Sequence, residues 1–338
     1  MKIPYTHQEK PIFLAPMAGY TNLPFRIIAK AMGADVVITE MISAKGLYYG
    51  DKKTKTLMQT VEGEKPVGLQ IFGHEIPILT HVVQKELNKT TFDFIDFNAG
   101  CPAPKIVKNN EGAALMKNPQ LLCEILQALV DVSEKPVSVK MRIGWEQGSI
   151  TLLPIVEKLQ KIKLASICIH GRSRDAFYSG TANWDIIQEA VALSEIPIVL
   201  NGDITTGPLA AKAFEETGCA GIMVGRGAIG YPFIFQEIKD NLSGKTPRRI
   251  SPKQRLETAM THARLIDLLD YPEGAVKEMR RHLVAYTKSL PHSTTLRQAL
   301  FDTQTSDDIE KTLKAYASDV LGLTLEIQKD WINQYRSI

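Results

Sequence analysis

Residues able to bind an anion and move a proton lie at or near the ends of the apolar runs in this 338-residue sequence. Lys140 lies within one run, and Asn98 and His170 close two others. An amine, an amide and an imidazole at one site could hold an anionic group and position a reacting partner. The polar side chains that we place at the carboxyl ends of these runs are Gln70, Asn98, Cys101, Lys140, Arg142, His170, Arg172, Asn201, Asp203 and Arg226.

Cys101 differs from the other cysteines because Gly100 and Pro102 hold its backbone in a turn directly after a predicted strand. An ordinary thiol, with a pKa of about 8.5, is mostly protonated at neutral pH. Cys101 is therefore a candidate general acid that needs no activation. The alternative is a buried structural cysteine, which is our interpretation of Cys123, Cys168 and Cys219.

Lys140 has apolar neighbours on both sides, and a lysine in an apolar strand is costly unless it is paired or functional. One function is to face a cofactor that becomes anionic, such as a reduced flavin ring. His170 is predicted to lie two strand ends from Asn98 and could bond the same cofactor. A structural histidine is an equally weighted interpretation.

Glycines follow the last two apolar runs, at Gly202, Gly225 and Gly227. In a (β/α)₈ barrel the loops after strands seven and eight commonly bind phosphate, and Arg226 would add charge there. The alternative is that these glycines only form tight turns. The segment 225–230 also matches the dinucleotide pattern G-x-G-x-x-G, but no further strand follows it, so we reject that interpretation.

Eight short apolar runs alternate with helical patterns over the first 240 residues or so, which predicts parallel βαβ units. Eight strands and about 250 residues are typical of a closed (β/α)₈ TIM barrel, with an open doubly wound sheet as the alternative. The predicted strands are Ile12–Ala15, Asp35–Thr39, Val67–Phe72, Phe94–Asn98, Val137–Arg142, Ser166–His170, Ile198–Asn201 and Gly221–Val224. The clearest predicted helices are Pro24–Met32, Leu121–Ser133, Ile186–Ser194 and Leu209–Thr217.

The pattern changes after Leu242, where a short polar linker leads to Ser251-Pro252, an N-cap followed by proline at the first helical position. Only helical periodicity follows. We therefore predict a barrel domain over 1–242 and a small all-helical domain over 250–338. The net charge is +6 over residues 241–300, −3 over 301–338 and zero before them. This basic stretch indicates an anionic partner, or else a solvated helix face.

The composition is that of a soluble globular protein, with 44% hydrophobic and 23% charged residues. No apolar run is long enough to span a membrane, and the N-terminus lacks the apolar stretch of a signal peptide. The four cysteines form no C-x-x-C pair, so we expect neither a zinc site nor disulfides. We expect a metal-free protein of the reducing cytoplasm, without a membrane partner and monomeric.

The sequence resembles the tRNA-dihydrouridine synthases, and the B-type bacterial branch most closely. The similarity runs in family order through the predicted barrel, and it includes the Asn-x-Gly-Cys-Pro motif at Asn98–Pro102. In the family, Thr21-Asn22 is often Thr-Asp. The other matching segments are Ala15–Arg26, Lys140–Trp145, Ile169–Arg172, Asn201–Ile204 and Gly225-Arg226.

The resemblance implies a TIM barrel that binds FMN, followed by a helical tRNA-binding domain. It implies reduction of the C5–C6 double bond of particular uridines in tRNA, which we expect in the D-loop, with NADPH as electron donor. Hydride would pass from flavin N5 to uracil C6, and Cys101 would give a proton to C5. The residues that it assigns to the flavin are Pro16, Met17, Ala18, Gln70, Lys140, His170, Asn201, Gly202, Asp203, Gly225 and Arg226.

Asn98, Arg142 and Arg172 are the expected contacts of the substrate base. A uracil stacked in tRNA must flip out to reach a barrel mouth, and basic residues of the tail would offset that cost through RNA phosphates. These candidates are Lys253, Arg255, Arg264, Lys277, Arg280, Arg281, Lys288 and Arg297. Two alternatives remain open, a flavin-dependent reductase of a free pyrimidine or other small molecule and an RNA-binding factor without turnover.

Overall fold

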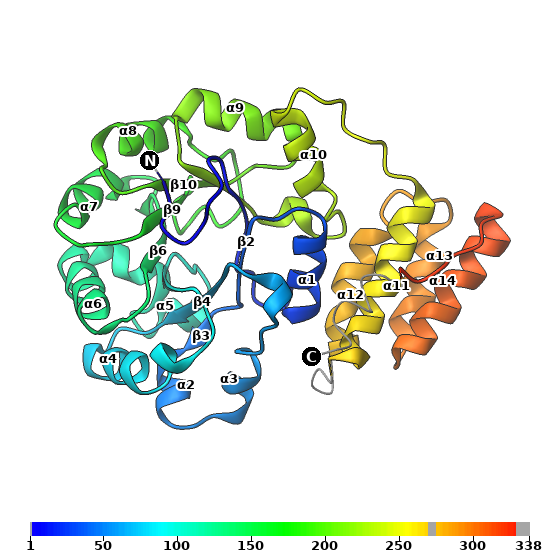
Figure 1. The fold of residues 1–338 in the computed structure, drawn as a ribbon, viewed down its shortest axis with the longest axis horizontal. Coiled ribbons are helices and arrows are strands. Elements are labelled where there is room, and N and C mark those ends of the chain that lie inside the picture. Colours follow the sequence, from blue (N-terminus) through cyan, green and yellow to red (C-terminus); the bar gives the residue numbers. More distant parts are fainter. Residues whose placement is uncertain (1, 270–274, 329–338) are drawn as a thin grey trace.

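The chain folds into a closed barrel of parallel strands, followed by a group of helices that packs against one side of it (Figure 1). The structure is a computed structural model, and it describes residues 2–269 and 275–328. The barrel strands are β1 (Ile12–Leu14), β2 (Val36–Ile38), β4 (Val67–Phe72), β5 (Phe94–Ala99), β6 (Val137–Arg142), β9 (Ser166–His170), β10 (Ile198–Asn201) and β11 (Gly221–Val224).

The ring of strands closes because β1 pairs with both β2 and β11, and β2 also pairs with β4. All eight barrel strands run parallel to their neighbours. The predicted (β/α)₈ barrel is confirmed and the open doubly wound sheet is excluded. Each predicted strand lies within one residue of the observed one at either end.

Three short strands were not predicted, because none is long enough to show an alternating pattern. Strand β3 (Ile42–Ser43) pairs with β4 at its carboxyl end. Directly after β6, strands β7 (Gly144–Glu146) and β8 (Ser149–Ile150) form an antiparallel hairpin. Both additions lie beside the carboxyl ends of barrel strands, where they extend the rim.

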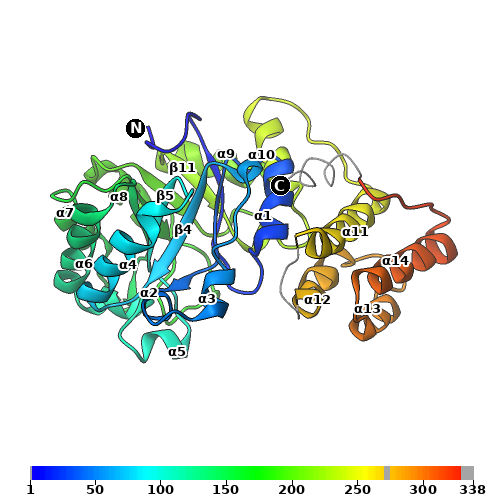
Figure 2. The same ribbon diagram turned by 60° about the horizontal axis from the view of Figure 1, so that its bottom comes forward.

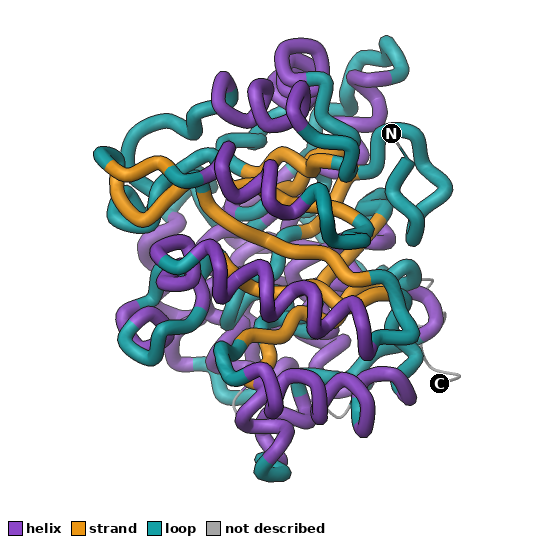
Figure 3. The backbone as a smooth tube through the Cα atoms, turned by 90° about the vertical axis from the view of Figure 1, so that its left-hand side faces the viewer, coloured by secondary structure: helices purple, strands orange, loops and turns teal. Residues whose placement is uncertain are grey.

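Helices surround the strands on the outside, as Figure 3 shows from the side opposite the C-terminal helices. Helix α6 illustrates why they form there: Asn118 caps it by accepting from the backbone of Leu121, and its buried residues recur at helical spacing. The barrel-region helices are α1 (Leu23–Ala31), α2 (Ala44–Tyr48), α3 (Lys52–Thr56), α4 (Ile76–Lys85), α5 (Pro104–Val107), α6 (Pro119–Val132), α7 (Leu152–Leu159), α8 (Asp185–Leu193), α9 (Gly207–Thr217) and α10 (Ile234–Leu242).

The barrel interior is apolar at one end and polar at the other. At the amino ends of the strands, Tyr5 stacks on Phe94 with 3.8 Å between ring centroids, and its hydroxyl lies 2.6 Å from that of Ser166. Further along, the buried carboxyl of Asp96 accepts hydrogen bonds from Gln70 and Ser138. The polar side chains of the barrel interior therefore lie nearer the carboxyl ends of the strands. This end of the barrel faces downward in Figure 2, beside α5.

The chain after α10 is helical wherever elements are described: α11 (Pro252–Leu268), α12 (Ala275–Tyr286), α13 (Ser293–Asp302) and α14 (Ser306–Leu321). The predicted start is confirmed, since Ser251 caps α11 and Pro252 occupies its first turn. Residues 329–338 of the predicted helical domain lie outside the described residues. Among the residues that are described, no helix is both long and apolar enough to cross a membrane.

The helical region packs on the barrel through α1 and the turn after β11. Leu265 of α11 joins an apolar cluster with Leu23 and Ile28 of the α1 segment. In α12, the Arg281 guanidinium donates to the carbonyl of Gly19, and Nε2 of His282 lies 3.1 Å from the carbonyl of Tyr20. These contacts join the helices to the loop that follows β1.

Two glycines test this packing, because they share a left-handed backbone, with φ of 69° at Gly230 and 70° at Gly244. A Cβ on Gly230 would lie 2.4 Å from the Cβ of Ala285 in α12, whereas a Cβ on Gly244 would meet nothing within 4 Å. We expect Gly230→Ala to lose about 1–3 kcal/mol more unfolding free energy than Gly244→Ala, because only Gly230→Ala also overpacks an interface. Urea unfolding measures both, and equal losses would contradict this packing.

Candidate active site

The polar residues at the carboxyl ends of the strands lie in register around the barrel mouth. Asn98 of β5 pairs with Lys140 of β6, and Asn201 of β10 pairs with His170 of β9. Gln70 lies one strand further, beside Asp96. The structure therefore brings together side chains that are more than 100 residues apart in the sequence.

Lys140 is a half-buried amine with one described hydrogen-bond partner, the Oδ1 atom of Asn201 at 2.9 Å. The amide of Asn201 is oriented by its own hydrogen bond from Nδ2 to the carbonyl of Met223. Burial lowers the pKa of Lys140. Among the ion pairs of the described residues, none includes Lys140, so the amine can face an additional acceptor.

His170 lies in the same layer and is held neutral. Burial, together with the charges of Lys140, Arg142, Arg172 and Arg226, lowers the pKa of its imidazole far below the ordinary value. Its Nε2 atom lies 3.4 Å from a guanidinium nitrogen of Arg172. A neutral imidazole at this position can donate or accept a hydrogen bond, but it cannot supply a proton near neutral pH.

Asp203 and Arg172 form the ion pair at the mouth. The Nη2 atom of Arg172 lies 2.8 Å from both carboxylate oxygens of Asp203, and Arg226 lies 3.9 Å away. Asp203 has a left-handed backbone with φ of 59°, and its carboxylate also accepts from the backbone of Ala182. The predicted site residue Asp203 is therefore engaged by protein groups, and Arg226 is left half-exposed beside it.

Cys101 is held in a turn by Asn98. The Oδ1 atom of Asn98 accepts from the backbone nitrogens of Gly100 and Cys101, at 3.1 and 2.9 Å. The Nδ2 atom of Asn98 donates to Oε1 of Gln70 at 2.8 Å. The carbonyl of Cys101 accepts from the backbone of Ala113, so both sides of the turn are tied. Asn98 and Gln70 therefore fix the position of the cysteine.

Burial raises the pKa of the Cys101 thiol, and nearby Arg142 and Lys140 offset this only in part. The thiol is therefore protonated at neutral pH, which suits a proton donor and not a thiolate nucleophile. Cys168 lies in the barrel interior, where burial raises its pKa to about 12.

Arg142 and Arg172 use their guanidinium groups to hold the loop 173–180 over the mouth. Arg142 donates to the carbonyls of Gly100, Ser173 and Phe177 at 2.8–3.0 Å. Arg172 donates to those of Ser179 and Gly180. Burial lowers the pKa of Arg142 to about 10. Both arginines lie at the mouth as predicted, with several of their donors already bonded to backbone.

Most of the chain matches one family model, described as dihydrouridine synthase, over residues 13–321. The chain belongs to the dihydrouridine synthase family. Because the enzymes of this family are oxidoreductases, the chain is an oxidoreductase. The resemblance to the dihydrouridine synthases that the sequence indicated is confirmed.

Relatives of the dihydrouridine synthase family align along nearly the whole chain. A probable tRNA-dihydrouridine synthase of Aquifex aeolicus is 33% identical over 309 residues, which cover 90% of this chain and 95% of the relative. The tRNA-dihydrouridine synthase B of Xanthomonas axonopodis pv. citri is 33% identical over 307 residues, covering 90% and 91%. The second match agrees with the resemblance to the B-type branch.

Solved structures share the barrel at low identity. A histamine dehydrogenase from Rhizobium sp. 4-9 has a TM-score of 0.53 and 13% identity, covering 90% of this chain and 64% of that one. An old yellow enzyme homologue from Zymomonas mobilis has a TM-score of 0.51 and 14% identity, covering 74% and 94%. At these identities the likeness supports the fold alone.

The loop after β1 contains Asn22, where the resemblance in the sequence led us to expect aspartate in many relatives. Asn22 caps α1 by accepting from the backbone of Phe25. Aspartate makes the same cap, so either residue preserves the helix start. Thr21 holds the loop through a hydrogen bond from the backbone of Met17, which fixes the predicted flavin-binding segment Pro16–Ala18.

Tyr178 is a mouth residue that sequence reasoning missed. Its ring centroid lies 4.4 Å from the Arg226 guanidinium carbon and 5.9 Å from that of Arg142. The side chain is 51% exposed. The available signal in the sequence was the aromatic pair Phe177-Tyr178 in the loop before Gly180. Its place at the mouth could not be predicted, because it depends on contacts with Arg142 and Arg226, which are distant in the sequence.

The predicted RNA contacts of the tail differ in the protein partners that the structure describes for them. Arg264 forms ion pairs with Glu310 and Asp307, and Lys253 lies 3.7 Å from Glu257. Arg255 donates to backbone carbonyls at the end of α12. Within the described residues no ion pair includes Lys277, Arg280, Arg281, Lys288 or Arg297.

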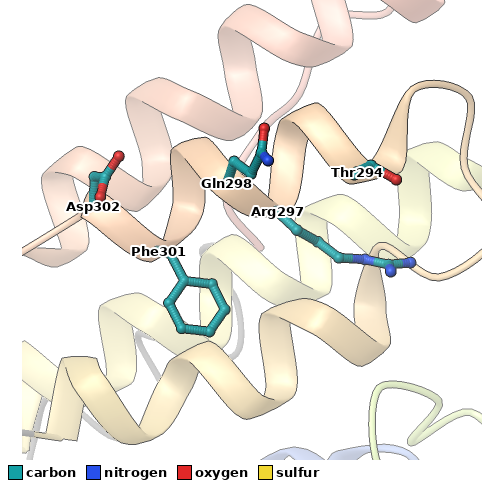
Figure 4. Close-up of a pocket in the computed structure, with 5 residues that line it drawn as sticks. All are labelled: Thr294, Arg297, Gln298, Phe301 and Asp302. Carbon is teal, nitrogen blue, oxygen red and sulfur yellow. The ribbon is translucent and has the colours of Figure 1, made fainter.

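A hollow of about 430 Å³ lies on α13 of the helical region (Figure 4). Its lining includes Arg297 and Phe301, and the guanidinium carbon of Arg280 lies 5.6 Å from the Phe301 ring centroid. Phe301 is 54% exposed. No group of three or more His, Cys, Asp or Glu side chains that could hold a metal occurs within 2–269 and 275–328.

The protonation state of Cys101 can be tested by alkylation. Because burial raises the pKa of Cys101, we expect its rate of alkylation by iodoacetamide to keep rising with pH beyond about 9. Mass spectrometry of the Cys101 peptide measures this rate. The same peptide in urea-unfolded protein provides the reference, near the ordinary pKa of about 8.5. A rate that levels off below the reference pKa would show a thiolate and contradict the acid role.

Proposed function

We propose that this protein is an FMN-dependent tRNA-dihydrouridine synthase, which reduces the C5–C6 double bond of uridines in tRNA at the expense of NADPH. The observation that carries the proposal is the Cys101 turn, held by Asn98 at the same register level as the half-buried Lys140, in a chain of the dihydrouridine synthase family. The barrel of residues 1–242 would hold FMN, and the helices of 250–338 would bind tRNA, with a D-loop uridine as target.

The residues present at the mouth fit an anionic flavin nucleotide. Lys140 has a single described partner and can face the ring edge where negative charge develops, and the neutral His170 can bond the same group. At Gly225 an added Cβ would have no neighbour closer than 3.7 Å, which leaves room for a phosphate to approach the backbone. Arg226 is half-exposed beside it and supplies positive charge.

Gly202 gives a second reason that this end of the barrel suits the cofactor. An added Cβ would lie 2.8 Å from Ala182 and 3.1 Å from the ring of His170, and φ is 122°. Only glycine keeps His170 in place there. We propose that Pro16, Met17, Ala18, Gln70, Asn201 and Asp203 complete the flavin site, several of them by positioning Lys140 and Arg172.

A bound flavin would supply the hydride that adds to C6 of the uracil. The chain's own task is to deliver the balancing proton to C5, and the protonated thiol of Cys101 is the donor. The two hydrogens convert uridine to dihydrouridine and NADPH is oxidised. Asn98 fixes the position of the thiol, and Arg142 joins the cysteine turn to the loop 173–180. We also propose that Asn98, Arg142 and Arg172 contact the uracil base and orient it toward the thiol.

The proposal is tested by nucleoside mass spectrometry of unmodified tRNA incubated with purified protein and NADPH. We expect uridine to gain two hydrogens with the native protein, and Cys101→Ala to lower that rate by roughly 100-fold or more while flavin absorbance and NADPH oxidation persist. Cys123→Ala, a half-buried cysteine on α6, is the matched control and should keep full activity.

Two results would contradict the proposal. Full dihydrouridine formation by Cys101→Ala would remove the proton-donor role. A yellow protein that oxidises NADPH and reduces free uridine, but leaves tRNA unchanged, would indicate a small-molecule reductase.

A further inference from the structure

Four side chains of alternating type form a stack on the rim of the barrel mouth. On β7, the ring of Trp145 contacts two cations, with Lys117 Nζ 4.4 Å and the Arg174 guanidinium carbon 4.5 Å from a ring centroid. The Arg174 guanidinium also lies 5.6 Å from the ring centroid of Phe177. We call Lys117, Trp145, Arg174 and Phe177 the rim stack.

Within the part of the chain that the structure describes, the cations of the rim stack form no ion pair. Among the described ion pairs, none includes Lys117 or Arg174, and the Nε atom of Arg174 is buried without a hydrogen-bond partner. The neighbouring carboxylate of Asp175 accepts from the hydroxyl of Ser173 instead. The rim stack therefore has unbalanced positive charge interleaved with aromatic faces.

Phe177 is presented outward at the exposed end of the stack. Its side chain is 39% exposed, and its backbone has φ of 47°, a left-handed conformation that is unfavourable for a bulky residue. Such conformations persist where the surroundings impose them, and they concentrate at functional sites. Here the Phe177 carbonyl accepts from the buried Arg142, which holds the residue in this conformation.

The rim stack is fixed relative to the cysteine turn. Arg142 bonds the carbonyl of Gly100, next to Cys101, and also that of Phe177. The backbone of Arg174 donates to the carbonyl of Gly144, and that of Asp175 to the carbonyl of Trp145. The rim stack and the reacting centre therefore form one rigid frame.

We propose that the rim stack binds an unpaired nucleotide next to the uridine being reduced, with its base against Phe177 and its phosphate near Arg174 and Lys117. The inference rests on the proposed function, since a target base that enters the barrel mouth disrupts the stacking of its neighbours. Unstacked bases in RNA are received by aromatic side chains and arginine planes, and phosphates by unpaired cations. The rim stack offers all three at one place.

The decisive variant removes the aromatic face of Phe177 but keeps an apolar side chain at that position. We expect Phe177→Leu to weaken binding of unmodified tRNA by roughly 5- to 100-fold, the range typical for loss of one base–aromatic stack, and to raise KM for tRNA with it. Phe177→Tyr is the matched control, since it keeps the ring and should bind like the native protein. Fluorescence anisotropy without NADPH measures affinity independently of turnover.

Lys117→Gln provides a second readout on an exposed side chain. We expect it to reduce the slope of log Kd against log salt concentration by about one, as expected for one lost phosphate contact. Flavin content, NADPH oxidation without tRNA and the melting temperature should be unchanged in all three variants, because none of these residues contacts the proposed flavin site.

The inference is overturned if Phe177→Leu binds tRNA as the native protein does. It is also overturned if Phe177→Leu and Phe177→Tyr both bind tRNA more weakly and both lose flavin or melt at a lower temperature. The rim stack would then merely support the β7–β8 hairpin. If the native protein forms no dihydrouridine, the proposed function fails separately, because the binding series requires no turnover.

Discussion

The organisation of the barrel mouth depends on buried positive charge that the protein balances only in part. Lys140 bonds a neutral amide, Arg142 bonds only backbone carbonyls, and Asp203 is the one carboxylate paired with Arg172. Burying cations in this way is costly unless an anion completes the site. Burial, helped by the same charges, lowers the pKa of His170 and keeps its imidazole neutral, so the mouth is suited to bind a negatively charged group. Burial also raises the pKa of the Cys101 thiol, so the turn after β5 presents a protonated acid near neutral pH.

The arginines also explain how loops on a barrel rim become rigid. Arg142 connects the turn after β5 to the loop 173–180, and Arg172 connects that loop to the turn after β10 through Asp203. Each guanidinium offers several donors in a fixed plane, so a single side chain can tie two segments together. The mouth is therefore preorganised, with the cysteine, the cations and the exposed aromatic residues held by the same hydrogen bonds.

The strands and their terminal residues could be predicted because the information is local. A run such as Val137–Arg142 shows both its buried strand and its polar end within six residues, and the order of such runs determines their neighbours in a parallel barrel. The contacts of the side chains could not be predicted in this way. Arg142 bonds a carbonyl 35 residues away, and Arg281 bonds one 262 residues away. The β7–β8 hairpin, which positions Trp145, is too short to have a periodic signal.

The loop after β1 connects the barrel mouth to the helical region. Its first part, Pro16–Ala18, lies at the strand end. The carbonyl of Gly19 accepts from Arg281 of α12, and the carbonyl of Tyr20 lies beside Nε2 of His282. The Arg281 guanidinium also lies over the Tyr20 ring. Arg281 forms no ion pair with another described residue, and a phosphate bound there would lie against the segment that also borders the proposed flavin. Because apolar packing of Leu265 on α1 fixes the helices to the barrel, the protein offers an RNA one fixed frame between α12 and the mouth. An RNA that contacts both must then adapt its own shape, and extruding one base is the adaptation that a barrel mouth accommodates.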